Sequence, residues 1–494
     1  MSNRPETNKQ SCPVYKKCGG CQLQNLSYPE QLEFKQKKVE KLLKRFCTVE
    51  KIIGMKTPYH YRNKVQAAFY TDKKGKIISG VYQSGSHHVV GIDSCQTEDV
   101  IADKIIVAVR KLLPSFRMTT YNEDTGKGFL RHILVKRGFA TNQIMLVLVT
   151  GTPVFPSKNN FVKAILKQFP EITTIVQNIN PYRTNLVLGD NQKVLYGKGY
   201  IEDILCGCRF RISPKSFYQI NPVQTEVLYG KAIEFANLKG NETVLDTYCG
   251  IGTIGIIAAK NGAGNVIGAE LNGDAVRDAI VNARANNLKN IRFYKADAGE
   301  FMREAADEDE KPDVVFMDPP RAGSDRKFLD SLIKMSPKKV VYVSCSPETL
   351  ARDLAYLTQN SPYKAQKIQP VDMFPHTAHI ETVVLLSHKK PDGHINVKVE
   401  FGEGEGKVPL DNIAKRAEEY KPKERVTYKM IKEYIEAKYG FKVHTAYIAE
   451  VKRDLGLPMY DAPNAAEGLK QTRKHPTQEK VNAIKDALNY YNLI

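Results

Sequence analysis

The sequence contains no apolar run approaching the ~20 residues that a membrane-spanning helix requires. Its opening stretch, MSNRPETNKQ, lacks the apolar core of a secretory signal, so we expect a cytoplasmic protein with no membrane partner. No internal repeat is present, and no repeat architecture is expected. The nine cysteines are odd in number, which argues against a disulfide framework in such a chain and favours metal binding or catalysis for several of them.

Acidic residues are scarce where basic residues are most common. The chain of 494 residues carries a formal net charge of +19, which favours a polyanionic partner. Residues 1–230 hold 34 Lys and Arg against 17 Asp and Glu, whereas residues 231–390 hold 21 of each and residues 391–494 hold 18 against 16. The basic excess therefore lies in the first 230 residues, which predicts a dedicated phosphate-contacting region there.

From about residue 216 onward, apolar strand-like runs alternate with helical patterns. The expected strands are 243–246, 265–270, 291–295, 313–318, 339–344, 363–372 and 381–387. Helices between consecutive strands imply an α/β fold with a doubly wound, largely parallel, Rossmann-like sheet. Upstream, β-like runs separated by Gly, Asn and Asp turns indicate a second, mixed α/β domain. Its expected strands are 65–70, 77–82, 133–136 and 144–150, and its expected helices are 99–113 and 158–168.

These patterns divide the chain into four predicted parts. They are a cysteine-cluster segment with a basic amphipathic helix (1–47), the mixed α/β, β-rich domain (48–214), the Rossmann-like domain (215–390) and a helical extension of unknown role (391–494). The basic helix is expected at 29–46, residues 1–11 are expected to be disordered, and 391–411 are expected to form a linker. The extension predicts helices at 427–438, 444–455 and 476–491.

A glycine-rich turn indicates a nucleotide cofactor. Asp246-Thr-Tyr-Cys-Gly-Ile-Gly-Thr253 follows an expected strand and opens a helix, but its spacing and leading acid differ from the dinucleotide motif G-x-G-x-x-G. Glu270 ends the next expected strand, where an acid commonly holds ribose hydroxyls. Asp297 ends the strand after that, in a position to read an adenine ring. Acids at successive strand ends behind such a turn favour S-adenosylmethionine.

Two further strand ends carry reactive groups. Cys345 stands in Val-Ser-Cys-Ser-Pro, after an expected strand, and Glu381 opens the last one. A lone cysteine after a strand is more often a small buried apolar residue, and a glutamate at the start of a strand is more often an ordinary solvated carboxylate. Together they fit the methylation of a carbon that is not itself nucleophilic, such as carbon 5 of uracil, which needs a thiolate and a base. The two prolines of Asp318-Pro-Pro-Arg321 predict an extended, rigid rim where the substrate would lie. An aromatic residue after Asp-Pro-Pro would suggest methylation of an amino group, and Arg321 at that position argues against it.

The motifs around these residues resemble the RNA uracil-5-methyltransferase family. They are Val-Ser-Cys-Ser-Pro (343–347), Asp-Pro-Pro-Arg-Ala-Gly (318–323), Asp-Met-Phe-Pro-His-Thr-Ala-His-Ile-Glu (372–381) and Phe-Tyr-Gln-Ile-Asn (217–221). The resemblance covers residues 12–388 and implies that Cys345 is the nucleophile and Glu381 the base. It also implies S-adenosylmethionine contacts at Gln219, Tyr248, Thr253, Glu270, Asp297 and Asp318, although Thr253 stands where some relatives have Asn.

The N-terminal cysteines form a candidate metal site. Cys12, Cys18 and Cys21 lie around a Gly-Gly turn, and Cys95 is a plausible fourth ligand from the β-rich domain. Four thiolates suit either zinc or a four-iron cluster, and spacing alone does not choose between them. Resemblance to the ribosomal-RNA branch of the family implies a four-iron four-sulfur cluster held by these four residues.

Three hypotheses for function follow. The first is a methyltransferase that modifies a uridine in structured RNA, expected to be 23S ribosomal RNA, with the base flipped into the site and phosphates held by the basic helix and the β-rich domain. The second keeps this chemistry but takes transfer RNA as the substrate. The third is a non-catalytic iron–sulfur RNA-binding factor. A monomer is expected, although the sequence does not fix the oligomeric state.

Overall fold

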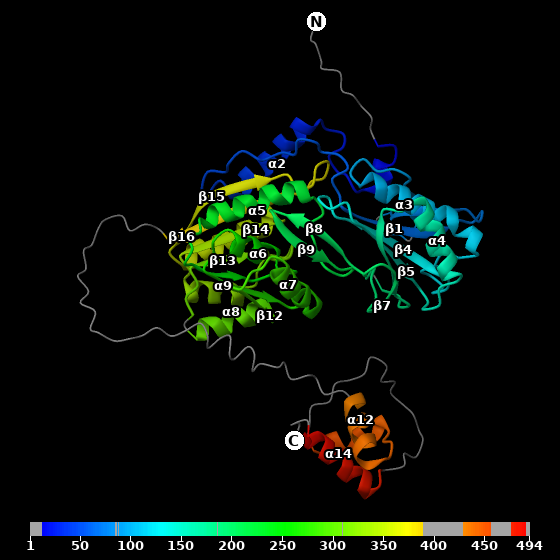
Figure 1. Ribbon diagram of the computed structural model, residues 1–494. Coiled ribbons are helices and arrows are strands. Elements are labelled where there is room, and N and C mark those ends of the chain that lie inside the picture. Colours follow the sequence, from blue (N-terminus) through cyan, green and yellow to red (C-terminus); the bar gives the residue numbers. More distant parts are fainter. Residues whose placement is uncertain are drawn as a thin grey trace. The chain divides into compact units, whose positions relative to one another are not determined.

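The computed structural model describes residues 12–388 except 84, 85, 87, 185 and 309, together with 428–455 and 476–490. The chain divides into two compact units, Met1–Phe401 and Gly402–Ile494 (Figure 1). Each unit has a hydrophobic core of its own. The disorder predicted for 1–11 and the linker predicted at 391–411 lie outside the described residues.

The first sheet of the larger unit is mostly antiparallel, with β5 and β6 as its parallel pair. In the order β3-β2-β1-β4-β5-β6-β7 it contains β1 (Lys64–Thr71), β2 (Ile77–Tyr82), β3 (Val89–Gly91), β4 (Leu130–Arg137), β5 (Ile144–Thr150), β6 (Ile172–Ile179) and β7 (Asn191–Tyr196). Helices α3 (Val100–Leu112) and α4 (Lys158–Gln168) and the 3-10 turn η1 (Pro114–Phe116) pack on one face. This region therefore has the mixed α/β structure predicted from the sequence.

The strand β5 shows why this sheet is buried on both faces. Side chains alternate along a strand, so Ile144, Leu146 and Leu148 enter the core beneath α3 and α4. Met145 and Val147, on the opposite face, enter the core of the second sheet. A continuous apolar run is what a strand covered on both sides requires.

The second sheet is doubly wound, as predicted, with a parallel part and an antiparallel end. In the order β12-β11-β10-β13-β14-β16-β15 it contains β10 (Thr243–Asp246), β11 (Asn265–Glu270), β12 (Ile291–Lys295), β13 (Val314–Met317), β14 (Lys339–Ser344), β15 (Tyr363–Val371) and β16 (Glu381–His388). β10 to β14 run parallel, whereas β16 runs antiparallel to both β14 and β15. The last strand along the chain is thus inserted between two earlier ones.

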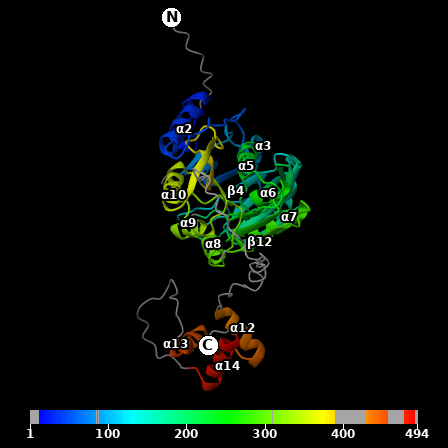
Figure 2. The ribbon, with the colours of Figure 1, turned by 90° about the vertical axis from the view of Figure 1, so that its left-hand side faces the viewer.

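Three helices cover each face of this sheet (Figure 2). One face carries α5 (Pro222–Ala236), α6 (Thr253–Lys260) and α7 (Gly273–Ala285), and the other carries α8 (Ala298–Asp307), α9 (Arg326–Met335) and α10 (Pro347–Asn360). The hairpin β8 (Ile201–Leu205) and β9 (Cys208–Ile212) lies between the two sheets, and its apolar side chains join both in one core. The boundary predicted at 214–215 stays a prediction, because the two regions share this core.

The N-terminal segment runs along the edge of the second sheet. It contains α1 (Tyr15–Cys18) and α2 (Tyr28–Leu43), and α2 begins with a capping box formed by Ser27 and Glu30. Isolated bridges then pair Val49 with Ile368 and Ile53 with Val371, next to edge strand β15. The predicted basic helix is confirmed.

Lys35 of α2 does not have the role expected of the basic helix. Its ammonium group is buried and lies 2.6 Å from the Asp372 carboxylate. A buried ammonium group needs a counter-ion, and Asp372 supplies it, so Lys35 is not available to phosphate. Lys37 and Lys38, in contrast, lie at the surface in ion pairs with Glu33 and Glu348.

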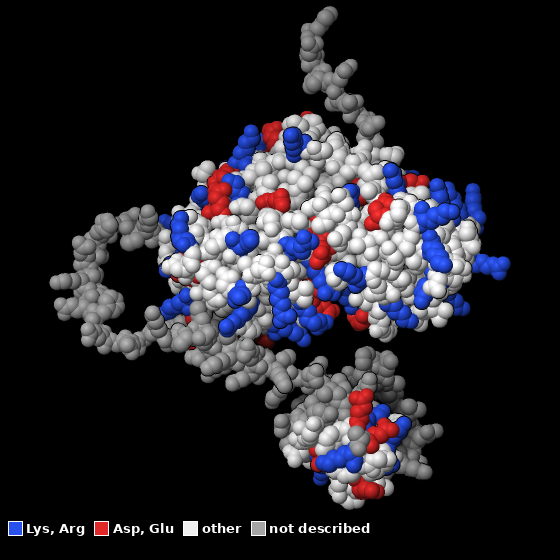
Figure 3. Space-filling view, viewed as in Figure 1, with Lys and Arg blue, Asp and Glu red and all other residues white. Residues whose placement is uncertain are grey.

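Basic side chains gather over the helices of the first sheet (Figure 3). The exposed ones on and beside α3 and α4 are Lys104, Lys111, Arg117, Lys158, Lys163 and Lys167. This distribution agrees with the basic excess of the first 230 residues.

The described residues of the smaller unit, 428–455 and 476–490, form three helices. They are α12 (Tyr428–Tyr439), α13 (Thr445–Asp454) and α14 (Gln478–Tyr490), close to the predicted ranges. Their apolar faces meet around Ile431, Ile448 and Ile484. Across the described ranges of both units, the helices fall short of the length and apolarity needed to cross a bilayer.

Candidate active site

The register of two neighbouring strands brings Cys345 and Glu381 together. β14 and β16 run antiparallel, and the last pair of their ladder joins Ser344 to Thr382. Continued by one position beyond this ladder, the same register would set Cys345 opposite Glu381, and the charge of Glu381 acts on the pKa of the Cys345 thiol, so the two groups lie close together. Residues directly opposite each other in antiparallel strands have Cα atoms ~4.5–5.5 Å apart. Asp318 follows β13, on the other side of β14, so it reaches the same edge of the sheet.

Glu381 is a buried carboxyl group, not the solvated one that its strand-end position alone suggested. The residue is only 4% exposed. Burial raises its pKa well above the ordinary value, the charge of Asp318 raises the pKa further, and the nearby cation of Arg321 lowers it. The outcome is a carboxyl group with an unusually high affinity for a proton.

Cys345 is half-buried in the turn between β14 and α10. Burial raises the pKa of its thiol to about 11, with further increases from Glu381 and Asp318 and an opposing decrease from Arg321. Ser344 and Ser346 fix the turn, because the Ser344 hydroxyl donates to the Ser346 carbonyl and accepts from the Ser346 amide. The resting group is therefore a thiol beside a carboxyl group, and Arg321 is the cation that favours its thiolate.

The Asp318-Pro-Pro-Arg rim is held in place by α10. Thr349 donates to the carbonyl oxygen of Arg321 at 3.2 Å, and Arg352 donates to that of Ala322 at 2.9 Å. Gly323 has φ of +75°, and a Cβ there would lie 2.6 Å from the side chains of Arg352 and Asp353, so only glycine fits. Desolvation raises the pKa of Asp318 to about 7.

The glycine-rich turn leaves space beside an unsatisfied carboxylate. Asp246 Oδ2 accepts from the Gly255 amide at 2.8 Å, whereas the buried Oδ1 meets no hydrogen-bond donor in the described part of the chain. Burial, Asp318 and Glu270 raise the pKa of Asp246 to about 7. Gly250 has φ of +55°, and no described atom lies within 4 Å of where its Cβ would stand. The backbone is thus open to a ligand next to an acceptor that lacks a partner, which fits the expected S-adenosylmethionine.

The other predicted cofactor contacts surround this turn. Glu270 accepts from the Gly250 amide at 3.1 Å and from the Asn272 amide at 2.7 Å. Tyr248 lies against the ring of Phe328. One oxygen of Asp297 caps α8 by accepting from the amides of residues 299 and 300, so this acid has a structural task in addition to any contact with an adenine ring.

Sequence reasoning missed Tyr229, which links two of the predicted contacts. Its buried hydroxyl interacts with the side chains of Gln219 and Thr253. Gln219 comes from the loop before α5, and Thr253 is the first residue of α6. No local motif marks Tyr229, because it is an ordinary core position of α5.

The loop with Gln219 is also fixed from the first sheet. The buried ammonium group of Lys136 donates to the carbonyl oxygens of Ser213 and Ser216, and Asn63 donates to that of Gln219 at 3.1 Å. Burial lowers the pKa of Lys136 to about 7. Two carbonyl acceptors replace water around this group, so the β-rich sheet takes part in shaping the site.

The four cysteines of the candidate metal site line one cavity, together with Gln24 and Thr97. They are Cys12, Cys18, Cys21 and Cys95. Within the described ranges, no three His, Cys, Asp or Glu side chains have the geometry that would hold a single metal ion. Burial and the neighbouring Cys95 raise the pKa of Cys21 to about 12, whereas Arg62 lowers it. The four predicted ligands therefore line one cavity, but in the described part of the chain they do not have the geometry of a metal site.

Comparisons with known proteins agree with one another. A family model described as tRNA (Uracil-5-)-methyltransferase matches residues 183–389. The chain is 44% identical to an uncharacterized RNA methyltransferase of Bacillus cereus over 388 residues, 78% of this chain and 84% of that protein. It is 46% identical to one of Listeria monocytogenes over 379 residues, 76% of this chain and 83% of that protein.

A solved structure is similar over both sheets. It is the tRNA (uracil-54, C5)-methyltransferase of Pyrococcus abyssi in complex with S-adenosyl-L-homocysteine, with 30% sequence identity and a TM-score of 0.63. The similarity covers 74% of this chain and 85% of that one.

The raised pKa of Cys345 predicts how its reactivity depends on pH. Alkylation by iodoacetamide should accelerate ~10-fold per pH unit from pH 7 to 10, because the reactive thiolate is a minor species below a pKa of about 11. Arg321→Gln should slow the reaction at each pH, whereas Arg326→Gln, which removes a cation lying over Tyr356, should not. Mass spectrometry of the peptide with Cys345 gives the rates. A rate independent of pH would contradict a protonated resting thiol.

Proposed function

The chain belongs to the RNA uracil-5-methyltransferase family, and from that premise we propose that Cys345 and Glu381 methylate carbon 5 of a uridine. The protein is an S-adenosylmethionine-dependent RNA methyltransferase. The observation that supports these roles most directly is the β14–β16 register, which brings a thiol close to a buried carboxyl group.

The proposed reaction uses the pair in two steps. The Cys345 thiolate attacks carbon 6 of uracil, and the electrons of the C5–C6 double bond move toward carbon 5, which takes the methyl group. Glu381 then accepts the carbon 5 proton. The electrons of that C–H bond restore the double bond, and the S–C6 bond breaks to return the thiolate. The raised pKa of Glu381 suits this second step, because a carboxylate with a higher pKa is a stronger base for the carbon 5 proton.

The acidic groups beside the pair suit a cationic methyl donor. Besides burial, the charges of Asp318 and Glu270 raise the pKa of Asp246, and the charge of Asp318 raises that of Glu381, as expected where carboxyl groups crowd together. S-adenosylmethionine supplies a methyl group on a positively charged sulfur, which these carboxylates attract. The demethylated product has lost that charge, so the same groups favour its release.

The substrate that we propose is a uridine of structured RNA, in 23S ribosomal RNA. The base must leave its stack to reach Cys345, and the exposed ring of Phe217, close to Gln219, offers it a stacking surface. The basic side chains over α3 and α4 suit the phosphates around the target. Transfer RNA is the second candidate, favoured by the names of the family model and of the Pyrococcus abyssi enzyme.

Mapping 5-methyluridine in RNA from cells with and without this protein separates these substrates. Loss of the modification from 23S ribosomal RNA supports the first proposal, and loss from transfer RNA supports the second. Unchanged modification of all RNA, with RNA binding intact, would instead favour the non-catalytic factor.

We also propose that Cys12, Cys18, Cys21 and Cys95 hold a four-iron four-sulfur cluster. The cavity that they share supports a common metal centre, and the resemblance to the ribosomal-RNA branch of the family favours a cluster over zinc. Burial raises the pKa of Cys18 and Cys21, and the guanidinium group of Arg62 opposes this rise, which favours the thiolate form that any metal requires.

Glu381→Gln should separate the two proposed steps. The variant keeps Cys345, so it should form the RNA adduct and transfer methyl, but it cannot accept the carbon 5 proton. A protein–RNA species that survives denaturation should accumulate on a gel. Cys345→Ala is the matched control, which should bind cofactor and form no adduct. Rapid release of methylated RNA by Glu381→Gln would exclude Glu381 as the essential base.

Protein purified without oxygen should be brown and contain about four irons per chain. Replacing any one of the four cysteines by Ser should bleach the colour and reduce solubility, because the cluster would tie residues 12–21 to the first sheet. Cys47→Ser, at a half-buried thiol outside the cavity, is the matched control and should stay brown. Colourless protein with one tightly bound zinc would contradict the cluster.

A further inference from the structure

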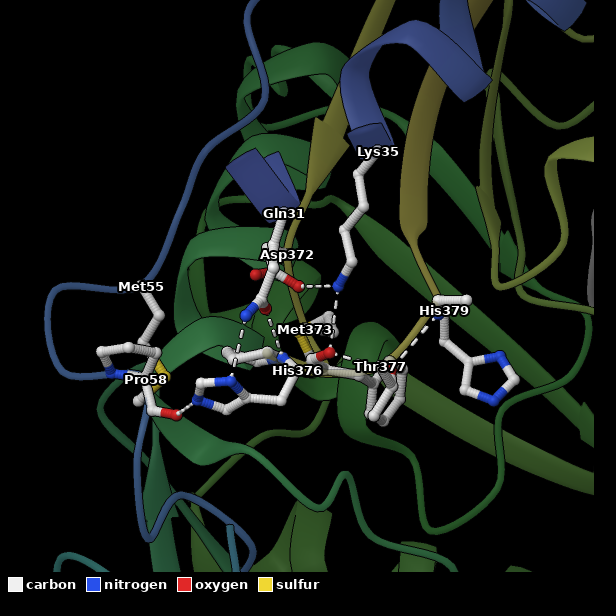
Figure 4. A network of polar contacts seen from close by, with 12 residues as sticks. Gln31, Lys35, Met55, Pro58, Asp372, Met373, His376, Thr377 and His379 are labelled. Atoms are coloured by element: carbon white, nitrogen blue, oxygen red, sulfur yellow. Dashed lines mark hydrogen bonds and ion pairs between the residues drawn. The ribbon is translucent and has the colours of Figure 1, made fainter. Parts of the chain in front are cut away.

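The loop that leads to Glu381 is held by the N-terminal segment. Residues 372–380 connect β15 to β16, and Glu381 is the first residue of β16. Side chains and one backbone amide of residues 22–35 contact this loop at four places along its length. Figure 4 shows the contacts made by Gln31 and Lys35. The contacts are Lys35 Nζ to Asp372 Oδ1 at 2.6 Å and to the Phe374 oxygen at 3.0 Å, the His376 amide to Gln31 Oε1 at 2.8 Å, the Leu23 amide to the His376 oxygen at 2.9 Å and the Ala378 amide to Gln22 Oε1 at 3.2 Å.

Gln31 forms hydrogen bonds with both the backbone amide and the imidazole ring of His376. The His376 ring contacts the Pro58 carbonyl oxygen through Nε2 at 2.9 Å, and only a protonated nitrogen can donate there. Because burial lowers the pKa of His376, the ring is neutral and Nδ1 is the acceptor that Gln31 Nε2 meets at 3.2 Å. Gln31 is buried and also donates to the Leu26 carbonyl oxygen at 3.0 Å.

The backbone of the loop needs this support. His376 has φ of +68°, in the left-handed region that residues other than glycine rarely adopt. Such a conformation persists only where the surroundings fix it, and Gln31 and Leu23 hold its amide and its carbonyl. Glu381 lies five residues after this bend, where the same loop enters β16.

Gln22 connects the same loop to the cysteines. Its Nε2 donates to the Gly19 carbonyl oxygen at 2.8 Å, between Cys18 and Cys21, while its Oε1 accepts from Ala378. One amide side chain thus touches both the turn of the candidate metal site and the loop of the proposed base.

We propose that Gln22 and Gln31 are positioning residues for proton removal, acting through residues 376–378 on Glu381. The proposal rests on the base role proposed for Glu381. Cys345 lies outside this network, because its turn is held by Ser344 and Ser346. Loss of either glutamine should therefore impair the release of product and spare the formation of the adduct. The cysteine segment would act on the reaction through the same contacts.

Two isotopes distinguish the steps in single-turnover experiments with full-length protein. Labelled methyl from S-adenosylmethionine reports transfer to RNA, and tritium released from carbon 5 of labelled uridine reports proton removal. Gln22→Ala and Gln31→Leu should transfer methyl within ~3-fold of the wild-type rate and release tritium ~10–100-fold more slowly, since small displacements of a reacting group cost up to ~10²-fold. The denaturation-resistant adduct should accumulate, and the KM for RNA should stay unchanged.

Gln36→Leu is the matched control on the same helix. Gln36 accepts a hydrogen bond from the Ile52 amide at 2.7 Å and donates one to the Glu50 carbonyl oxygen at 3.2 Å. Its replacement therefore removes contacts of α2 that do not involve residues 372–380. Its ratio of tritium release to methyl transfer should equal that of the wild type. Gln22→Glu keeps the acceptor for Ala378 and should recover most of the tritium-release rate.

The outcomes separate this proposal from the one on which it rests. Tritium release at the wild-type rate in both Gln22→Ala and Gln31→Leu would overturn the positioning role, and so would an equal defect in Gln36→Leu. Absence of any adduct in Glu381→Gln would instead overturn the proposed chemistry of the Cys345 and Glu381 pair.

Discussion

The site depends on the antiparallel insertion of β16 between β14 and β15. In a purely parallel sheet, the carboxyl edge receives only residues that follow strands. The reversed strand β16 brings the start of a strand to that edge, so Glu381 comes close to Cys345, one position beyond the last pair of the ladder. A shift of the β16 pairing register by one residue would turn the Glu381 side chain to the opposite face of the sheet. The pairing of β16 with both neighbours, over most of its length, prevents that shift.

Desolvation gives the groups at this edge their chemistry. Burial raises the pKa of Cys345, Asp318, Asp246 and Glu381, and their mutual repulsion adds to the effect for all but Asp318. Arg321 is the cation that opposes this trend at Cys345 and Glu381. A site of this kind holds protons and cations tightly until substrates reorganise it, which fits a reaction that moves a proton and a positively charged methyl donor.

Much of this fold could be predicted from the sequence, because strands with apolar runs and clear turns have few alternatives. The bounds of β10, β11, β12 and β14 agree with the predicted ranges. β7 was missed because nearly all of its side chains are exposed, which leaves no apolar pattern to detect. The order β14-β16-β15, the pairing of Lys35 with Asp372 and the support of His376 by Gln31 join residues far apart in sequence, and no local pattern specifies them.

In the proposed reaction, Cys345 bonds to carbon 6 of the target uridine before Glu381 removes the carbon 5 proton. RNA in which that uridine carries fluorine at carbon 5 tests this most directly, because the base cannot remove fluorine as a proton and the adduct cannot be released. Incubation with S-adenosylmethionine, followed by digestion and mass spectrometry, should find methylated fluorouridine attached to the peptide with Cys345. An adduct on another cysteine, or methylation with no adduct, would contradict the account.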